Sequence, residues 1–174
     1  MSARFGLSRA HAQDDGGFSM SKNKDVTLTE VNESNFLEAM SLRVAESQRG
    51  FVADAAGILA RGYVFRADRA RVYAVQVQNE LVGLLLVRDL KEEPACYDLQ
   101  QLMIDARHQN RGYGTSALEQ LLSSLKQEHA FDMVEVCVKK DDAAALHVYA
   151  KAGFIDSGYI DEDAPDSLNL VYYL

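Results

Sequence analysis

Fourteen residues, from Leu102 to Thr115, join an apolar run, a polar turn with two glycines and the start of a helix. The apolar run ends at Asp105, and the helix that follows carries leucines along one face. Free backbone N–H groups converge at such a helix start, where the helix dipole also favours an anion. The sequence therefore predicts a site for a phosphate-bearing ligand in this turn.

Two common phosphate motifs do not fit this turn. A P-loop carries Lys-Ser/Thr after its second glycine, whereas Gly114 is followed by Thr115-Ser116. A dinucleotide-binding turn needs a third glycine, which is missing after Gly112-x-Gly114. What remains is Gln109-x-x-Gly112-x-Gly114. Taken alone, this short pattern leaves a plain strand-to-helix turn open as an alternative.

A second pattern lies downstream, in Ala145-x-x-x-Tyr149-x-x-x-Gly153-Phe154. A strand-like run precedes it, an acidic pair starts its helix and Gly153 ends that helix. In order and spacing, the two patterns resemble the coenzyme motifs of the GCN5-related N-acetyltransferases, the GNAT family. The resemblance spans about residues 97–155.

The elements that would position these motifs follow from hydrophobic periodicity and turn signals. The expected strands are 26–31, 71–78, 81–88, 97–105, 131–138 and 168–174, and the expected helices are 34–44, 54–61, 115–126 and 143–152. We expect Ser34 to cap the first helix and the second to end near Gly62. The order β-α-α-β-β-β-α-β-α-β is that of the GNAT fold, an α/β fold with a mixed sheet covered by helices.

Length favours a single GNAT domain over residues 25–174, because 174 residues are typical of one domain. Residues 1–24 are polar and contain Gly16-Gly17, so we interpret them as a disordered extension or a leader. Met20 is an alternative native start.

Composition limits the class of protein. The net charge of −8 at pH 7 argues against nucleic-acid binding; it permits attraction of a cationic substrate, with ordinary solubility as the alternative. No apolar run approaches the ~20 residues of a membrane span, and no secretory signal is visible. Cys96 and Cys137 are expected to be reduced, buried thiols, which favours the cytoplasm. The four histidines match no ligand spacing, so no metal is expected.

Acetyl transfer to an amine requires a deprotonated amine, a stabilised oxyanion and a proton for the leaving thiolate. The resemblance implies acetyl-CoA as co-substrate and Tyr149 as the acid beside its sulfur. It also places Asp98 where several relatives carry a glutamate base that works through water. Strand alternation predicts that Asp98, Gln100 and Leu102 share one face.

The resemblance also implies the coenzyme contacts. The backbone of Met103 and Ile104 would pair with the pantetheine arm as if it were an extra strand, where two strands splay apart, usually at a bulge. Arg107 adds positive charge nearby. The turn residues that would bind the pyrophosphate are Gln109, Asn110, Arg111, Gly112, Tyr113, Gly114 and Thr115. Asp142 stands where the family usually has Asn, so it serves either the pantetheine or only the helix cap.

The acceptor site in this fold would involve residues 43–63 and 157–166. The first segment is similar to the early region of bacterial spermine/spermidine acetyltransferases, which favours a diamine or polyamine. Those relatives often carry an acid where this chain has Gln100. Aminoglycosides, protein amino groups and a non-catalytic acyl-CoA-binding module stay open as alternatives. A homodimer is expected only by analogy with the family.

Overall fold

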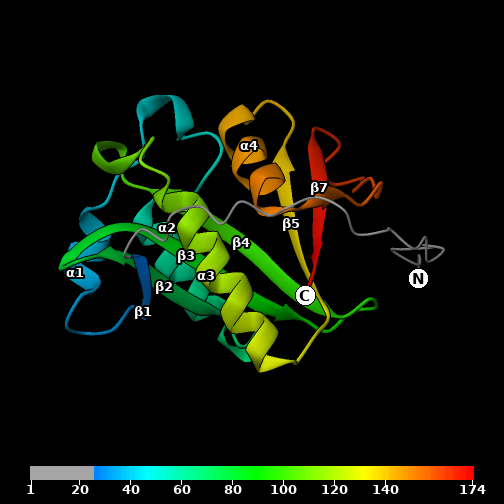
Figure 1. Ribbon diagram of the computed structural model, residues 1–174, viewed down its shortest axis with the longest axis horizontal. Coiled ribbons are helices and arrows are strands. Elements are labelled where there is room, and N and C mark those ends of the chain that lie inside the picture. The colour runs from blue at the N-terminus through cyan, green and yellow to red at the C-terminus, as the bar shows by residue number, and fades with distance from the viewer. Residues whose placement is uncertain (1–25) are drawn as a thin grey trace, which may run out of the picture.

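One mixed sheet of seven strands forms the centre of the computed structural model, which describes residues 26–174 (Figure 1). The expected extension at residues 1–24 lies outside the described residues. In chain order the elements are β1 (Val26–Glu30), α1 (Phe36–Ser41), η1 (Glu46–Gln48), α2 (Ala55–Val64), η2 (Arg66–Asp68), β2 (Arg71–Val77), β3 (Glu80–Leu90), β4 (Cys96–Ile104), η3 (Ala106–His108), α3 (Tyr113–Glu128), β5 (Met133–Lys139), α4 (Ala143–Ala152), β6 (Ile155–Asp156) and β7 (Ser167–Tyr173). The mixed α/β fold expected from the sequence is confirmed.

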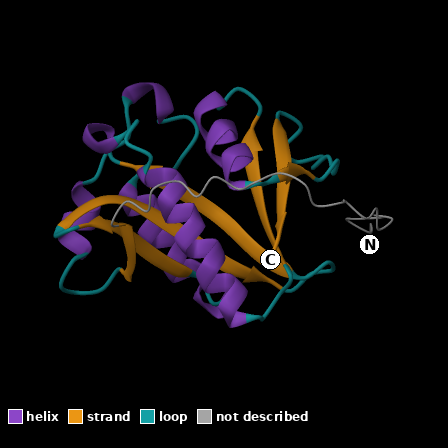
Figure 2. Cartoon of the chain, viewed as in Figure 1, coloured by secondary structure: helices purple, strands orange, loops and turns teal. Residues whose placement is uncertain are grey.

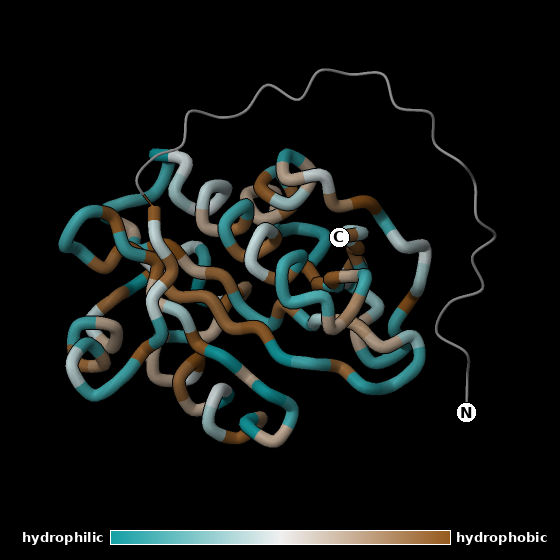
Figure 3. Tube along the Cα trace, turned by 60° about the horizontal axis from the view of Figure 1, so that its bottom comes forward, coloured by the Kyte–Doolittle hydropathy of each residue, from teal (hydrophilic) through white to brown (hydrophobic). Residues whose placement is uncertain are grey.

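Helices cover both faces of the sheet (Figures 1 and 2). On one face, the leucines of α3 and the apolar side of α4 pack on alternate residues of β3, β4 and β5. On the other face, α1 and α2 pack on a separate set of residues from β2, β3 and β4. Hydrophobic chain segments are therefore concentrated in the central strands, and hydrophilic ones in the outer loops (Figure 3). The apolar strands that the sequence analysis singled out are buried because both of their faces are covered.

The first two helices differ from their predicted bounds. α1 begins after Asn35 rather than being capped by Ser34, and it ends at Ser41 because Leu42 takes an extended conformation. α2 continues through Gly62 to Val64. A Cβ at Gly62 would lie 2.4 Å from Val72 Cγ2, so this glycine permits close packing of helix on strand rather than ending the helix. The sequence analysis also missed β6, a two-residue edge strand.

The strand order is β1-β2-β3-β4-β5-β7-β6, and all pairs are antiparallel except β4 with β5. That parallel pair is short, because only Tyr97 and Asp98 of β4 pair with Val134 and Glu135 of β5. Beyond Asp98, β4 continues to Ile104 beside β3 alone, while β5 pairs with β7 along its length. The two central strands therefore diverge toward the start of α4 (Figures 1 and 2).

A bulge in β4 lies next to this divergence. Leu86 of β3 pairs with Gln101, and the next residue, Val87, pairs with Leu99, so Gln100 is the extra residue. The bulge breaks the expected alternation, since it turns both Gln100 and Gln101 toward α2. Leu102 consequently packs on the opposite, α3-bearing face, and the prediction that it shares a face with Asp98 is wrong.

Candidate active site

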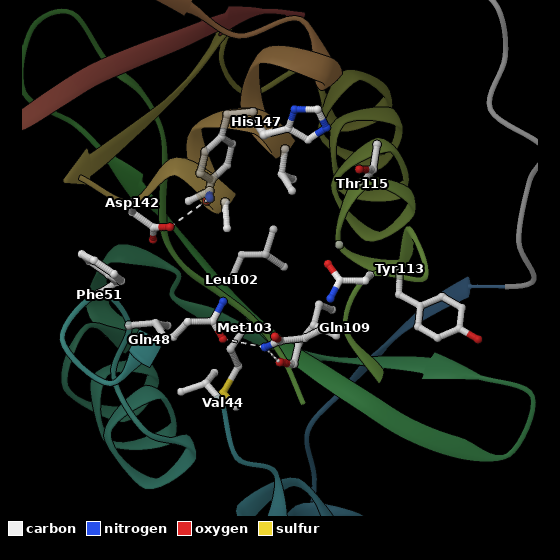
Figure 4. Close-up of a pocket in the computed structure, with 18 of the residues that line it drawn as sticks. Val44, Gln48, Phe51, Leu102, Met103, Gln109, Tyr113, Thr115, Asp142 and His147 are labelled. Atoms are coloured by element: carbon white, nitrogen blue, oxygen red, sulfur yellow. Dashed lines mark hydrogen bonds between the residues drawn. The ribbon is translucent and has the colours of Figure 1, made fainter. Parts of the chain in front are cut away.

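A cavity of about 470 Å³ fills the space between the diverging strands (Figure 4). Its walls come from the end of β4, the segment between α1 and α2, the turn before α3, and α4. Phe51 and Gln48 lie on the α1–α2 side, and His147 lies on the α4 side. Segments far apart in sequence thus meet at the point where β5 leaves β4.

The exposed edge of β4 offers backbone groups to this cavity. Asp105 N donates to Val82 O at 2.8 Å, so the backbone of Asp105 faces β3. In an antiparallel pair, residues whose backbone groups face the partner strand alternate with residues whose backbone groups face away from it. The backbone groups of Met103 therefore face β3, and those of Leu102 and Ile104 face the cavity. Met103 therefore contributes its side chain to the wall, while Leu102 and Ile104 present their backbone groups at the open edge of β4.

The turn between β4 and α3 is built to expose amides. Asn110 and Gly112 have positive φ angles of 59° and 80°, and α3 begins directly after Gly112. The N–H groups at this helix start have no acceptor within the helix, and those of Gly114 and Thr115 are among them. Gly112, Gly114 and Thr115 all line the cavity, as the phosphate-binding prediction requires.

Gln109 organises the same turn. Its Nε2 donates to Ile104 O at 2.9 Å and to Gln48 Oε1 at 2.6 Å (Figure 4). A primary amide carries two N–H donors, so both bonds form at once. The coenzyme motif marked Gln109, and the resemblance of the early segment included Gln48, but the contact between the two side chains was not predicted.

Tyr149 lies on the α4 wall of the cavity and is 5% exposed. Its ring packs edge-on against Phe154 at 5.3 Å. Burial, with a smaller contribution from the charge of Asp142, raises the pKa of the Tyr149 phenol above its ordinary value. The hydroxyl is therefore protonated at neutral pH and available as a donor.

The comparisons with known proteins match this geometry. The acetyltransferase (GNAT) family model covers residues 36–154, more than half of the chain. The chain belongs to the GNAT family of acetyltransferases. No curated protein sequence matches it.

Solved structures share the GNAT fold of this domain at low sequence identity. Spermidine N-acetyltransferase from Vibrio cholerae, in complex with CoA and spermine, has a TM-score of 0.69 and 16% identity, over 87% of this chain and 96% of that one. Aminoglycoside acetyltransferase AAC(6')-Ib, in complex with coenzyme A, has a TM-score of 0.70 and 18% identity, over 85% and 94%. An acetyltransferase from Thermus thermophilus has a TM-score of 0.67 and 20% identity, over 86% and 97%.

Asp142 caps α4 of the GNAT domain and also lines the cavity. Its carboxylate accepts the N–H of Ala145 at 3.0 Å. The capping interpretation accounts for one carboxylate oxygen. His147, one helical turn further on, is exposed at the cavity edge, as expected for a surface residue.

The structure does not bring Asp98 to the cavity wall of this GNAT domain. Its side chain is 13% exposed, and Oδ2 accepts from Arg88 Nε at 2.8 Å and from Gln100 Nε2 at 2.6 Å. Both contacts tie the carboxylate to β3 and to its own strand, away from the residues that line the cavity. The geometry therefore gives no support to the expectation that Asp98 is the base.

The charged residues around the turn divide into two kinds. Arg107 Nε donates to Asp105 at 2.8 Å, so its charge is already paired. Arg111 donates to the carbonyl of Arg107 at 3.1 Å and is exposed. Neither Arg107 nor Arg111 is among the residues that line the cavity.

Asp105 connects the turn to the segment after α1, and its replacement tests that connection. Oδ2 accepts from Arg43 N at 2.9 Å, and Oδ1 accepts from Arg107 N at 3.0 Å. Burial opposes the charge, but these hydrogen bonds outweigh it and lower the pKa of Asp105. We expect Asp105→Asn to reduce the free energy of unfolding at pH 7 by about 1–3 kcal/mol. The side-chain NH₂ of the new Asn would face one of the two backbone N–H groups that the carboxylate now accepts, so that two donors would meet without an acceptor.

The pH dependence of this loss follows from the lowered pKa. The stabilising effect is complete above the unfolded-state pKa, about 3.9, and is lost as the pH falls through the folded-state value. Urea denaturation should give a constant gap between wild type and variant from pH 5 to 8, and a smaller gap below about pH 4. A gap that persists unchanged into strong acid would contradict the assignment.

Between residues 26 and 174, no three His, Cys, Asp or Glu side chains gather to hold a metal ion. No helix in the same range has the length and apolar character to cross a bilayer. Cys96 is buried as expected, but Cys137 on β5 is exposed, so that part of the cysteine prediction is wrong.

Proposed function

We propose that this GNAT domain transfers an acetyl group from acetyl-CoA to a primary amine of a small molecule, a diamine or polyamine, by direct attack in a ternary complex. The observation that carries the proposal is the divergence of β4 and β5 over a cavity with the start of α3 on one wall and a buried tyrosine on another. Acetyl-CoA fits these features: its pyrophosphate would lie at the amides of that helix start, its extended arm along the open edge of β4, and its thioester beside the tyrosine.

Each element has a role in this proposal. Leu102 and Ile104 pair with the amides of the pantetheine arm through their backbone groups. The amides from Gly112 to Thr115 bind the pyrophosphate, as a helix N-terminus does. Tyr149 gives a proton to the sulfur as the carbon–sulfur bond of the tetrahedral intermediate breaks. Among the described residues that line the cavity, only Asp142 carries a carboxylate, and that carboxylate caps α4. The amine proton therefore leaves to solvent.

Two observations favour a cationic acceptor. Partial burial raises the pKa of the Cys137 thiol, and the charges of Asp161, Asp98 and Glu135 raise it further, so these carboxylates lie near Cys137 on β5; Asp98 is paired with Arg88, and none of the three lines the cavity. The fold neighbours include enzymes named for spermidine and for aminoglycosides, and both compounds are polyamines in the chemical sense. An aminoglycoside is therefore the second candidate acceptor.

An amine panel tests the proposal. Thiol release from acetyl-CoA is measured with spermidine, spermine, putrescine, an aminoglycoside and a lysine peptide. We expect turnover with the small diamines or polyamines above all others. Turnover confined to the lysine peptide would overturn the acceptor class. Coenzyme binding without turnover on any amine would overturn catalysis and leave an acyl-CoA-binding module.

Asp98→Asn separates a base role from a structural one. Because Asp98 is paired with Arg88 and lies off the cavity wall, we expect the pH profile of kcat/KM to keep its shape in the variant. The free energy of unfolding should fall by about 1–3 kcal/mol, since Arg88 loses its partner. Activity lost selectively at low pH, where fewer amines are deprotonated, would instead restore Asp98 as the base.

A further inference from the structure

The segment between α1 and α2, residues 43–53, forms one side of the cavity but has little core of its own. None of its residues is fully buried, and η1 within it has no side-chain cap. Segments with few buried contacts open at low free-energy cost. Near its two ends, Val44, Val52 and Ala53 pack on the core beside α1 and α2, so the position of its middle depends on the polar contacts that it makes with the rest of the chain.

Both ends of this segment are fixed to β4 and its extension. At the first end, Ala106 N donates to Arg43 O at 2.7 Å, beside the bond from Arg43 N to Asp105. At the second end, Ala53 N donates to Gln101 Oε1 at 2.8 Å, and the β4 bulge is what turns Gln101 toward it. Between these ends, Gln48 makes the contact that joins the middle of the segment to the turn before α3.

That contact is the 2.6 Å hydrogen bond from Gln109 Nε2 to Gln48 Oε1 (Figure 4). The two residues are 61 positions apart in sequence, and both line the cavity. Gln109 is anchored in turn to Ile104 O at the open edge of β4. A ligand that orders the turn thus orders Gln109, and through it the middle of the segment.

We propose that Gln48 is a positioning residue which, through Gln109, couples occupation of the coenzyme site to the placement of segment 43–53 for the amine. The inference rests on the proposed function. Coenzyme binding fixes the turn, the Gln48–Gln109 bond fixes the segment, and the amine then meets a preformed wall. By thermodynamic linkage, a bound amine tightens coenzyme binding by the same factor.

Hydrogen exchange with coenzyme A alone tests the first half of the coupling. In wild type, we expect coenzyme A to slow exchange of the amides of residues 44–52. In Gln48→Met, which keeps the side-chain length but lacks the acceptor, this slowing should shrink about three- to tenfold, the worth of one net hydrogen bond. Equal slowing in both proteins would overturn the inference. Gln120→Met, on the exposed face of α3, is the matched control and should behave as wild type.

Calorimetry with spermidine tests the second half. The ratio of spermidine Kd without and with coenzyme A should fall about three- to tenfold in Gln48→Met, and at least as much in Gln109→Met, which also loses the bond to Ile104 O. The double variant should lose no more than Gln109→Met alone, because that variant has already lost the bond to Gln48. Additive losses would overturn the coupling. If wild type does not bind spermidine, the polyamine proposal fails, while the exchange experiment with coenzyme A still decides the role of Gln48.

Discussion

Tyr149→Phe is expected to lower kcat by about 100-fold or more while leaving the affinity for acetyl-CoA nearly unchanged, because general acid catalysis typically contributes 10²–10⁴-fold. The substitution removes one oxygen and keeps the ring that packs on Phe154. The cavity wall therefore keeps its shape, and the loss falls on the step in which the thiolate departs. A residue that acts only in that step changes kcat and kcat/KM together.

The environment of Tyr149 explains why its hydroxyl suits this step. Burial on α4 raises its pKa, so the proton is present throughout the range in which the amine substrate is deprotonated. An acid that titrated near neutrality would already be ionised at the alkaline pH where the amine loses its own proton, about 10.4 for an alkylammonium such as Lys. We therefore expect no fall in rate from tyrosine ionisation at moderately alkaline pH.

Single-turnover and steady-state kinetics with acetyl-CoA measure the loss, and calorimetry measures coenzyme binding. Tyr172→Phe is the matched control: it packs against the other side of the same aromatic group, with its ring 5.4 Å from Phe154, and it does not line the cavity. An unaltered rate in Tyr149→Phe would remove Tyr149 as the acid. An equal loss in the control would point to packing instead.

The parts of the site that the sequence predicted are those set by local chemistry. The turn from Gln109 to Thr115 can be recognised in the sequence, because the glycine with positive φ and the helix start that follows it are adjacent residues. Tyr149 lies where its motif placed it, since one helix carries both Tyr149 and the Gly153 cap. These features need only a few consecutive residues, so a single sequence reveals them.

The parts that the sequence did not predict depend on pairing between distant residues. The family resemblance implies a bulge where the strands splay apart, but its position at Gln100 arises from the register of β4 against β3, and nothing in the residues Asp98 to Leu102 marks that position. It reverses the face of Leu102, and it places Gln101 against Ala53. Gln48 is another case, because its partner lies 61 residues away and both side chains are ordinary amides.

Gly112→Val is expected to weaken coenzyme A binding by about 100-fold or more, the cost of losing one or two charge-assisted hydrogen bonds to phosphate. Gly112 has a φ of 80°, and a β-branched residue is strongly disfavoured there. The turn must then adopt another conformation, which redirects the amides that follow it. Calorimetric titration with coenzyme A measures the loss, and unchanged affinity would contradict the role given to this turn.

Backbone strain alone would also destabilise the protein, so a second glycine separates strain from binding. Gly158, in the loop after β6, has a φ of 71° and open space around the position of a Cβ. Gly158→Val therefore carries the same conformational penalty without a steric clash and away from the cavity wall. We expect both variants to lower the free energy of unfolding by similar amounts, about 1–2 kcal/mol for a side chain forced into the left-handed region. Because only Gly112 sits where the amides meet the phosphates, only its variant should lose the coenzyme.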